Sequence, residues 1–246
     1  MENSRKVALV TGSATGIGRA VAVRFAREGF AVAVNYSKSE TDAEETLALV
    51  KGHRVPAILC RANVADDGAV RAMVARCGEE LGGLDVLVNN AGTTHFIEHT
   101  DLEALTDEVW DSILGVNLKG AFFCCRAAMP LLQERGGTIV NVTSVAGLGG
   151  QGSSIPYAAS KAALNCVTKS LARAFGPKVR VNAVAPGPVL TRWLEGHMER
   201  VEQFVQGAPL QRAATPEDIA DVVAFLALSG GLMTGQVVTV DGGRTM

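Results

Sequence analysis

Short apolar runs alternate with longer segments of helical period along almost the whole chain. The apolar runs consist mostly of Val, Ile, Leu and Ala without strict polar alternation, which is typical of strands buried on both faces of a parallel sheet. We expect strands at residues 6–11, 31–35, 55–60, 84–88, 138–142, 179–184 and 237–240.

The segments between these runs carry apolar residues at the spacing of amphipathic helices. We expect helices at residues 16–28, 40–51, 66–80, 216–227, near 106–135 and near 156–175. Repeated strand–helix alternation predicts an α/β fold: a single-domain, Rossmann-type, doubly wound parallel sheet of about seven strands with helices on both faces. No internal repeat or composition shift divides the chain, so we expect one domain over residues 1–246. Ligands of such a sheet bind at the carboxyl ends of the strands.

One segment departs from this regular alternation. Residues 188–212 follow a predicted strand, contain Pro188 and Pro209, and include an amphipathic stretch at 192–206. A connection of this length beside the predicted crevice indicates a substrate cover. We expect its apolar side chains and residues 93–96 to form two walls of an apolar or mixed pocket; the apolar side chains are Trp193, Leu194, Met198 and Phe204.

Composition excludes several classes of function. The chain has 246 residues and 48% hydrophobic residues, and its 23 basic and 25 acidic residues form no block of like charge, which argues against nucleic acid as a partner. Five cysteines show no metal-ligand spacing, so we expect no metal site and reduced core thiols in a cytoplasmic protein. A short polar lead runs directly into the first strand, unlike a signal peptide, and no apolar stretch approaches the ~20 residues of a membrane span.

A glycine-rich turn joins the first predicted strand to the first helix. Gly12, Gly16 and Gly18 stand where the pyrophosphate of a dinucleotide meets a helix N-terminus. Glycines permit a tight turn and a close approach of backbone N–H groups to phosphate oxygens. The turn by itself leaves two alternatives open: a corner that needs glycine for steric reasons, and the similar turn of a methyltransferase.

The end of the second predicted strand bears on the choice of cofactor. It reads Asn35, Tyr36, Ser37 and Lys38, where an acidic residue would bind the ribose of NAD. Hydroxyls and a lysine suit a 2′-phosphate, so NADP(H) is favoured over NAD(H). The alternative is a solvated Ser/Lys turn.

Three residues around the fifth predicted strand and the following helix form a candidate catalytic set. Tyr157 and Lys161 are four positions apart on a predicted helix, about 40° and about 6 Å from each other, so they share a face. Tyrosine loses its proton near pH 10, and an adjacent ammonium lowers the pKa of the phenol by stabilising phenolate. Ser144 could hold a substrate oxygen by a hydrogen bond. A Tyr and a Lys at this spacing also occur on ordinary helices as packing and surface charge.

Taken together, these residues resemble the classical short-chain dehydrogenases/reductases over essentially the whole chain. The glycine turn, residues 89–92 (Asn-Asn-Ala-Gly), and the Ser144, Tyr157 and Lys161 set match the family's motifs. The resemblance implies that Asn117 serves a proton relay behind the lysine. It also implies that the cofactor contacts are Gly12, Ser13, Thr15, Gly16, Ile17, Gly18, Asn35, Tyr36, Ser37, Lys38, Asn63, Val64, Asn90, Ala91, Gly92, Tyr157, Lys161, Pro186, Gly187, Val189 and Thr191. One departure is Asn63, where the family usually carries Asp before the valine.

The resemblance is greatest to the 3-oxoacyl-acyl-carrier-protein reductase group. It implies hydride transfer between NADP(H) and a carbonyl or alcohol substrate, such as a 3-oxoacyl thioester. Two other functions stay open: an NAD-dependent dehydrogenase of a sugar, steroid or small secondary alcohol, and a non-catalytic dinucleotide-binding regulator. The resemblance also implies a homotetramer or dimer.

Overall fold

The computed structural model describes residues 5–246, and its core is one parallel sheet. The seven strands are β1 (Val7–Val10), β2 (Ala31–Tyr36), β3 (Ala57–Arg61), β4 (Val86–Asn89), β5 (Thr138–Val142), β6 (Arg180–Pro186) and β7 (Val237–Val240). Their order is β3-β2-β1-β4-β5-β6-β7, and every neighbouring pair is parallel. The predicted seven-stranded, doubly wound sheet is therefore confirmed. The predicted polar lead, residues 1–4, lies outside the described residues.

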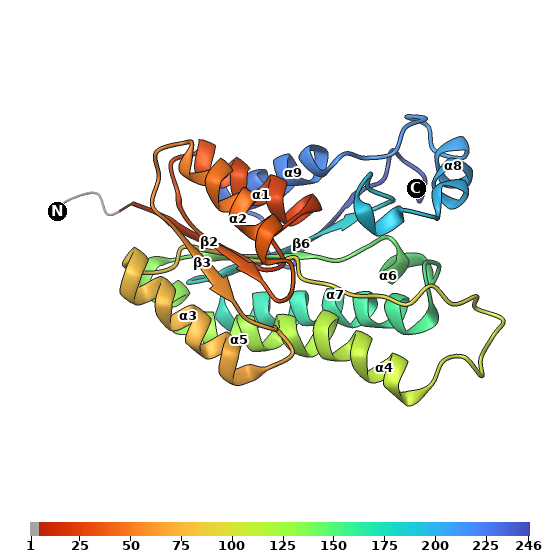
Figure 1. Cartoon of the computed structure of the whole chain (residues 1–246), viewed down its shortest axis with the longest axis horizontal. Coiled ribbons are helices and arrows are strands. Elements are labelled where there is room, and N and C mark those ends of the chain that lie inside the picture. The colour runs from red at the N-terminus through yellow and green to blue at the C-terminus, as the bar shows by residue number, and fades with distance from the viewer. Residues whose placement is uncertain (1–4) are drawn as a thin grey trace.

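Helices cover both faces of the sheet (Figure 1). One layer contains α1 (Gly16–Arg27), α2 (Glu40–Lys51) and α9 (Pro216–Leu228). The other contains α3 (Asp67–Leu81), α4 (Asp107–Leu114), α5 (Ala121–Arg135) and α7 (Ile155–Phe175). Each layer packs a separate cluster of buried apolar side chains against the sheet, as the near-continuous apolar strands predict.

The long helix expected near 106–135 is interrupted. A π-helical segment, Gly115–Gly120, separates α4 from α5, so the predicted single α-helix is wrong in its middle. Gly120 lies so close to the loop after β3 that a Cβ there would be 2.8 Å from Cγ2 of Val64. π-Helical turns inside α-helices often mark functional sites, and this one carries Asn117.

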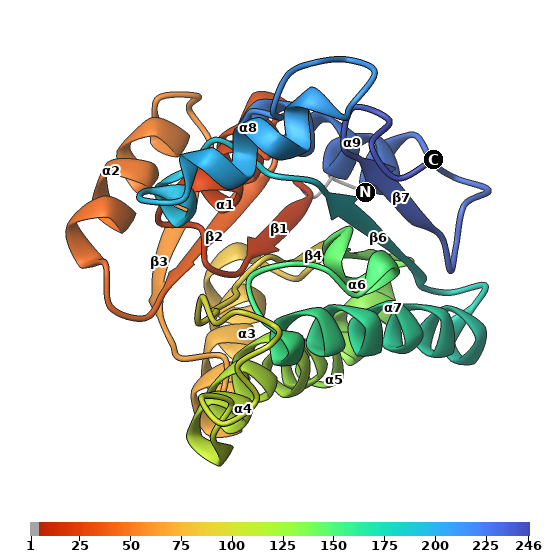
Figure 2. The same cartoon turned by 90° about the vertical axis from the view of Figure 1, so that its right-hand side faces the viewer.

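The strand order places a crevice at the carboxyl end of the sheet. β1 and β4 are neighbours, and the chain leaves them toward opposite halves of the sheet, which is the topological switch point of such folds. Figure 2 shows α6 (Ala146–Gly149) and α8 (Met198–Gln206) flanking this edge. The predicted amphipathic stretch 192–206 is two elements: a short 3₁₀ turn, Arg192–Leu194, and α8. Gly196, at φ 80°, stands between the two elements.

Two sequence expectations concern solvent and membrane. Within residues 5–246, no helix has the length and apolarity needed to cross a membrane. Four of the five cysteines are buried thiols, whereas Cys166 is exposed on α7 and is not the core thiol that we expected.

Candidate active site

The glycine turn brings three chain segments into contact at the carboxyl end of β1. Gly12 has φ +61°, and a Cβ there would lie 2.8 Å from Cα of Ala91. A Cβ on Gly18 would lie 2.8 Å from Cα of Ser13. The N-cap residue of α1, Thr15, makes no side-chain cap hydrogen bond, and the first turn of α1 has no acidic residue. Its backbone N–H groups therefore suit phosphate oxygens, and the turn fits a dinucleotide.

The Asn-Asn-Ala-Gly motif holds this turn from the neighbouring strand. Nδ2 of Asn90 donates to the carbonyl oxygens of Thr11 and Gly12, both at 3.0 Å. Oγ1 of Thr11 accepts from the backbone N–H groups of Asn90 at 3.0 Å and Ala91 at 3.1 Å. Thr11, which sequence reasoning passed over as a site residue, fixes the turn and the motif as one unit.

Asn35 lies beneath the turn rather than beside a ligand. It is 1% exposed, and its Oδ1 accepts from the backbone N–H of Gly12 at 2.9 Å. Its Nδ2 donates to the carbonyl oxygens of Cys60 and Ala62, both at 3.1 Å. Because both ends of the amide are bound within the protein, the predicted contact of Asn35 with the cofactor is replaced by a positioning role.

The residues after β2 divide into a buried and an exposed part. Tyr36 is buried, and its hydroxyl donates to Oε1 of Glu40 at 2.8 Å, so Glu40 raises the pKa of this phenol. Ser37 and Lys38 are exposed. The structure thus places the carboxylate of Glu40 at the end of β2, where the sequence showed no acidic residue at the expected ribose-binding position.

Tyr157, Lys161 and Ser144 meet at the carboxyl end of β5. Nζ of Lys161 donates to the carbonyl oxygen of Val142 at 2.9 Å and lies 5.7 Å from the centroid of the Tyr157 ring. Ser144 follows β5, and its side chain hydrogen-bonds the hydroxyl of Tyr157. The helical spacing of the sequence and the strand end therefore bring the three predicted residues together.

Burial dominates the ionisation of this set. It raises the pKa of Tyr157, and the hydrogen bond from Ser144 opposes this only in part. Burial also lowers the pKa of Lys161 from 10.5 to about 8. We expected Lys161 to lower the pKa of Tyr157, but in this structure burial of the phenol raises it. At neutral pH the phenol holds its proton, and most Lys161 side chains hold theirs.

Asn117 connects the substrate side to the catalytic helix. It is 1% exposed, and its Oδ1 accepts from the backbone N–H of Thr93 at 2.8 Å. Its Nδ2 donates to the carbonyl oxygen of Thr93 at 3.0 Å and to Oγ of Ser160 at 3.1 Å. Oγ of Ser160 in turn donates to the carbonyl oxygen of Tyr157 at 2.7 Å. The amide therefore ties α7 to the loop after β4, and the proton relay stays a prediction.

The remaining predicted contacts surround the crevice. The methyl group of Thr191 would lie 3.2 Å from a Cβ on Gly16, which places the start of the cover against the N-terminus of α1. Pro186 ends β6, and the backbone N–H of Gly187 donates to the carbonyl oxygen of Val240 at 2.9 Å. Val189 is buried.

The loop after β3 carries the two predicted adenine contacts. Val64 is buried, whereas Asn63 is exposed. Oδ1 of Asn63 accepts from the backbone N–H of Ala65 at 3.1 Å, so this oxygen turns the loop.

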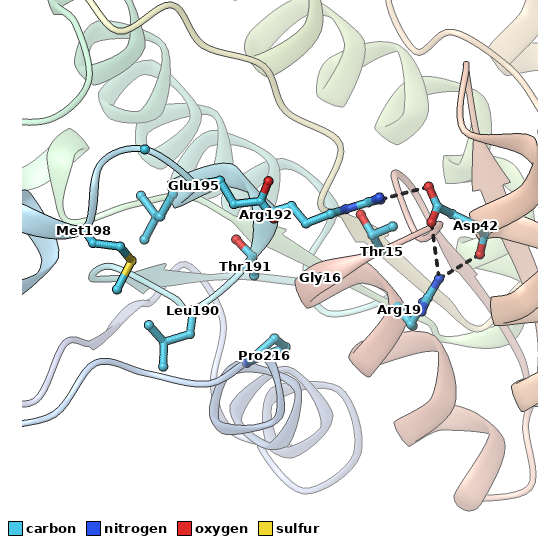
Figure 3. A pocket seen from close by; sticks show the side chains of 12 residues that line it. Thr15, Gly16, Arg19, Asp42, Leu190, Thr191, Arg192, Glu195, Met198 and Pro216 are labelled. Carbon is cyan, nitrogen blue, oxygen red and sulfur yellow. Dashed lines mark hydrogen bonds and ion pairs between the residues drawn. The ribbon is translucent and has the colours of Figure 1, made fainter.

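We expected the apolar side chains of the cover to form one wall of a pocket, but they lie in different places. The ring of Trp193 lies 6.2 Å from that of Tyr157 between centroids, and Phe96 stacks on His197 at 3.6 Å. Phe204 packs toward Gly187, where a Cβ would be 3.0 Å from its ring. By contrast, Leu194 and Met198 line a cavity of about 720 Å³ at the other side of the cover, beside α1 and α2 (Figure 3).

Comparisons with known proteins agree along nearly the whole chain. A family model described as enoyl-(acyl carrier protein) reductase matches residues 12–245. A Streptomyces violaceoruber protein, described as ketoacyl reductase 2 of the granaticin polyketide synthase, is 46% identical over 241 residues, covering 96% of this chain and 95% of that protein. The 3-oxoacyl-(acyl-carrier-protein) reductase FabG of Staphylococcus aureus is 40% identical over 245 residues, 98% of each chain. A crystal structure from Burkholderia xenovorans, described as a short-chain dehydrogenase/reductase, superposes with a TM-score of 0.93 at 37% identity and 99% coverage of both chains.

Proposed function

The chain belongs to the short-chain dehydrogenase/reductase family, and on that premise we propose that it reduces the ketone of a 3-oxoacyl thioester with NADPH. As a member of the family it is an oxidoreductase that uses a nicotinamide dinucleotide. The observation that carries the proposal is the meeting of Tyr157, Lys161 and Ser144 at the carboxyl end of β5, because a protonated phenol beside an ammonium can give its proton to a substrate oxygen.

The proposed mechanism assigns one task to each side chain. The reduced nicotinamide would supply a hydride to the carbonyl carbon. Ser144 holds the carbonyl oxygen by a hydrogen bond, and Tyr157 donates its phenolic proton to that oxygen as negative charge develops there. The ammonium of Lys161 then stabilises the phenolate that remains. Asn117 is a positioning residue, because it fixes α7 against the loop that borders the substrate.

The preference for NADPH rests on charge at the end of β2. The exposed side chains of Ser37 and Lys38 offer a hydroxyl and a cation for a 2′-phosphate. Glu40 works in the opposite direction, because its carboxylate is held at the hydroxyl of Tyr36 and could bind ribose hydroxyls instead. An NAD-dependent dehydrogenase of a secondary alcohol is therefore the second candidate.

The substrate class follows from the relatives. The Streptomyces violaceoruber and Staphylococcus aureus proteins carry names that specify a ketoacyl and a 3-oxoacyl substrate, and both match this chain over at least 95% of their length. The same ketone chemistry in this chain supports a 3-oxoacyl thioester as its substrate. Assembly into a homotetramer or dimer, which the family resemblance implies, stays a prediction that sedimentation would test.

Stopped-flow measurements of NADPH and NADH absorbance would test the proposal. The panel contains a 3-oxoacyl thioester, a keto sugar, a steroid ketone and a simple aliphatic ketone. We expect the fastest oxidation with NADPH and the thioester, and a loss of at least ~100-fold in kcat for Tyr157→Phe and for Lys161→Met. Lys169→Met is the matched control, since Lys169 is exposed on the same helix.

Each outcome distinguishes between the candidates. Oxidation of NADH with a preference for another ketone would favour the second candidate. Binding of dinucleotide without turnover of any ketone would support a non-catalytic regulator. A Tyr157→Phe variant as fast as the parent would exclude the proposed proton transfer.

A further inference from the structure

Two arginines lie at the cavity beside the N-terminus of α1, and they are used differently. Arg19 has several partners: its Nε donates to the carbonyl oxygen of Ala14 and to Oγ1 of Thr46, and its Nη2 donates to the carbonyl oxygen of Asp42 and to Oε2 of Glu45, at 2.8–3.1 Å. These bonds tie α1 to α2. The second arginine, Arg192, is held less firmly, by one carboxylate.

Arg192 reaches from the cover across the cavity to α2. Its Nη2 lies 2.8 Å from Oδ2 of Asp42, 150 positions away in the sequence, and this is its only side-chain partner among the described residues. Figure 3 shows the side chain extended past Thr15 toward Asp42. The side chain of Arg192 is 58% exposed, and such surface ion pairs contribute little to stability. Exchanging this partner for another anion is therefore easy.

The neighbouring groups indicate which anion fits. Thr15 and Gly16 line the cavity with the uncapped first turn of α1, and Thr191 lies against Gly16 directly before Arg192. Ser37 and Lys38, the groups suited to a 2′-phosphate, do not line it. An arginine beside free N–H groups at a helix N-terminus suits a pyrophosphate, which an arginine fork can bind through two oxygens.

We propose that Arg192 is a pyrophosphate-binding residue carried by the cover, and that it exchanges Asp42 for the cofactor's phosphate oxygens when the dinucleotide binds. The proposal rests on the proposed function, since it requires a dinucleotide at the glycine turn. In this arrangement Asp42 competes with the cofactor for the guanidinium. The exchange also draws the cover from α2 toward the cofactor, next to Trp193, which lies against the catalytic tyrosine.

The competition predicts opposite effects for the two partners of one ion pair. Arg192→Gln should raise the dissociation constants of NADPH and NADH alike by about tenfold, because both cofactors carry the pyrophosphate. Arg192→Lys should recover part of the loss, since it keeps the charge without the fork. Asp42→Asn should instead lower the dissociation constants of both cofactors by a few-fold. This gain in affinity should largely disappear in the double variant, Asp42→Asn with Arg192→Gln.

Dissociation constants from nicotinamide fluorescence titrations, without substrate, would test these expectations. Arg200→Gln is the matched control: Arg200 is a second cover arginine that pairs with Glu98, and it does not line the cavity. We expect Arg200→Gln to bind both cofactors like the parent. We also expect the dependence of binding on salt concentration to become weaker in Arg192→Gln, as loss of a phosphate contact requires.

Several results would overturn the inference. If Arg192→Gln and Asp42→Asn weaken binding equally, the pair is only a strap that holds the cover. If Arg192→Gln weakens the binding of NADPH but not of NADH, the residue contacts the 2′-phosphate and the assignment to the pyrophosphate is wrong. If Arg192→Gln binds both cofactors like the parent, the inference fails while the proposed function stands. If the parent binds neither cofactor, the proposed function itself fails.

Discussion

The buried charge of Lys161 should make the stability of this protein depend on pH in a defined window. The side chain is 4% exposed, and burial lowers its pKa from 10.5 to about 8. The folded state therefore resists protonation that the unfolded chain accepts. Below pH 8 this costs about 3 kcal/mol of unfolding free energy, and the cost disappears as the pH rises from 8 toward 10.5. Stability contributed by this residue thus increases with pH across that window.

Replacing Lys161 with Met removes the charge at similar length. The free energy of unfolding of the Met variant, relative to its Lys161 parent, should fall by about 2 kcal/mol between pH 7 and pH 10. Loss of the hydrogen bond to Val142 adds a constant offset, so the change with pH, rather than the sign at one pH, is the prediction. The comparison is best made in a Tyr157→Phe background, because the phenol of Tyr157 would otherwise titrate beside the lysine.

Urea unfolding followed by circular dichroism at pH 7, 8, 9 and 10, at one protein concentration, would measure this difference. Lys169→Met, at an exposed position on the same helix, should show no such dependence on pH. A difference for Lys161→Met that stays constant within ~0.5 kcal/mol from pH 7 to pH 10 would show that the lysine is not desolvated as its burial requires.

Three further predictions test other parts of the site. Asn117→Ala removes three hydrogen bonds of a buried amide and should cost about 2–3 kcal/mol in urea unfolding together with a lower kcat; an unchanged unfolding midpoint would contradict this. Tyr36→Asp should shift the ratio of kcat/KM from NADPH toward NADH, because a carboxylate repels the 2′-phosphate; an unaltered ratio would count against NADPH. Gly18→Ala places a Cβ 2.5 Å from Nδ2 of Asn90 and should weaken dinucleotide binding at least ~tenfold in fluorescence titrations, whereas Gly231→Ala, which faces open space, should bind normally.

Local patterns in the sequence were sufficient for the fold. The apolar strands and the helical periods predicted the seven-stranded sheet, and two strands, Thr138–Val142 and Val237–Val240, have the predicted bounds. The spacing of Tyr157 and Lys161 placed both on one helical face, because that depends only on the helical repeat. The glycine turn was equally local: steric freedom at Gly12 and Gly18 is a property of those residues and their immediate chain.

Such local patterns could not predict hydrogen bonds between residues that lie far apart in the sequence. Asn35 looked like a ligand contact by position, yet its amide is bound to residues 12, 60 and 62. Asn117 gave no indication of its bonds to Thr93 and Ser160, which lie 24 and 43 positions away. Periodicity also gave no sign of the π-helical segment that carries it, because the segment spans only six residues inside a longer helical pattern.

The sequence by itself thus determined the strands and most of the helices, which end of the sheet carries the site, and which residues are available for proton transfer. The tertiary structure decided how those residues ionise and what holds them. The pKa of Tyr157 is raised and that of Lys161 is lowered because packing removes water from both groups. The ion pair of Arg192 with Asp42 likewise exists only once the cover folds across the sheet edge. Desolvation and long-range contacts depend on the whole packed chain, whereas secondary structure depends on neighbouring residues.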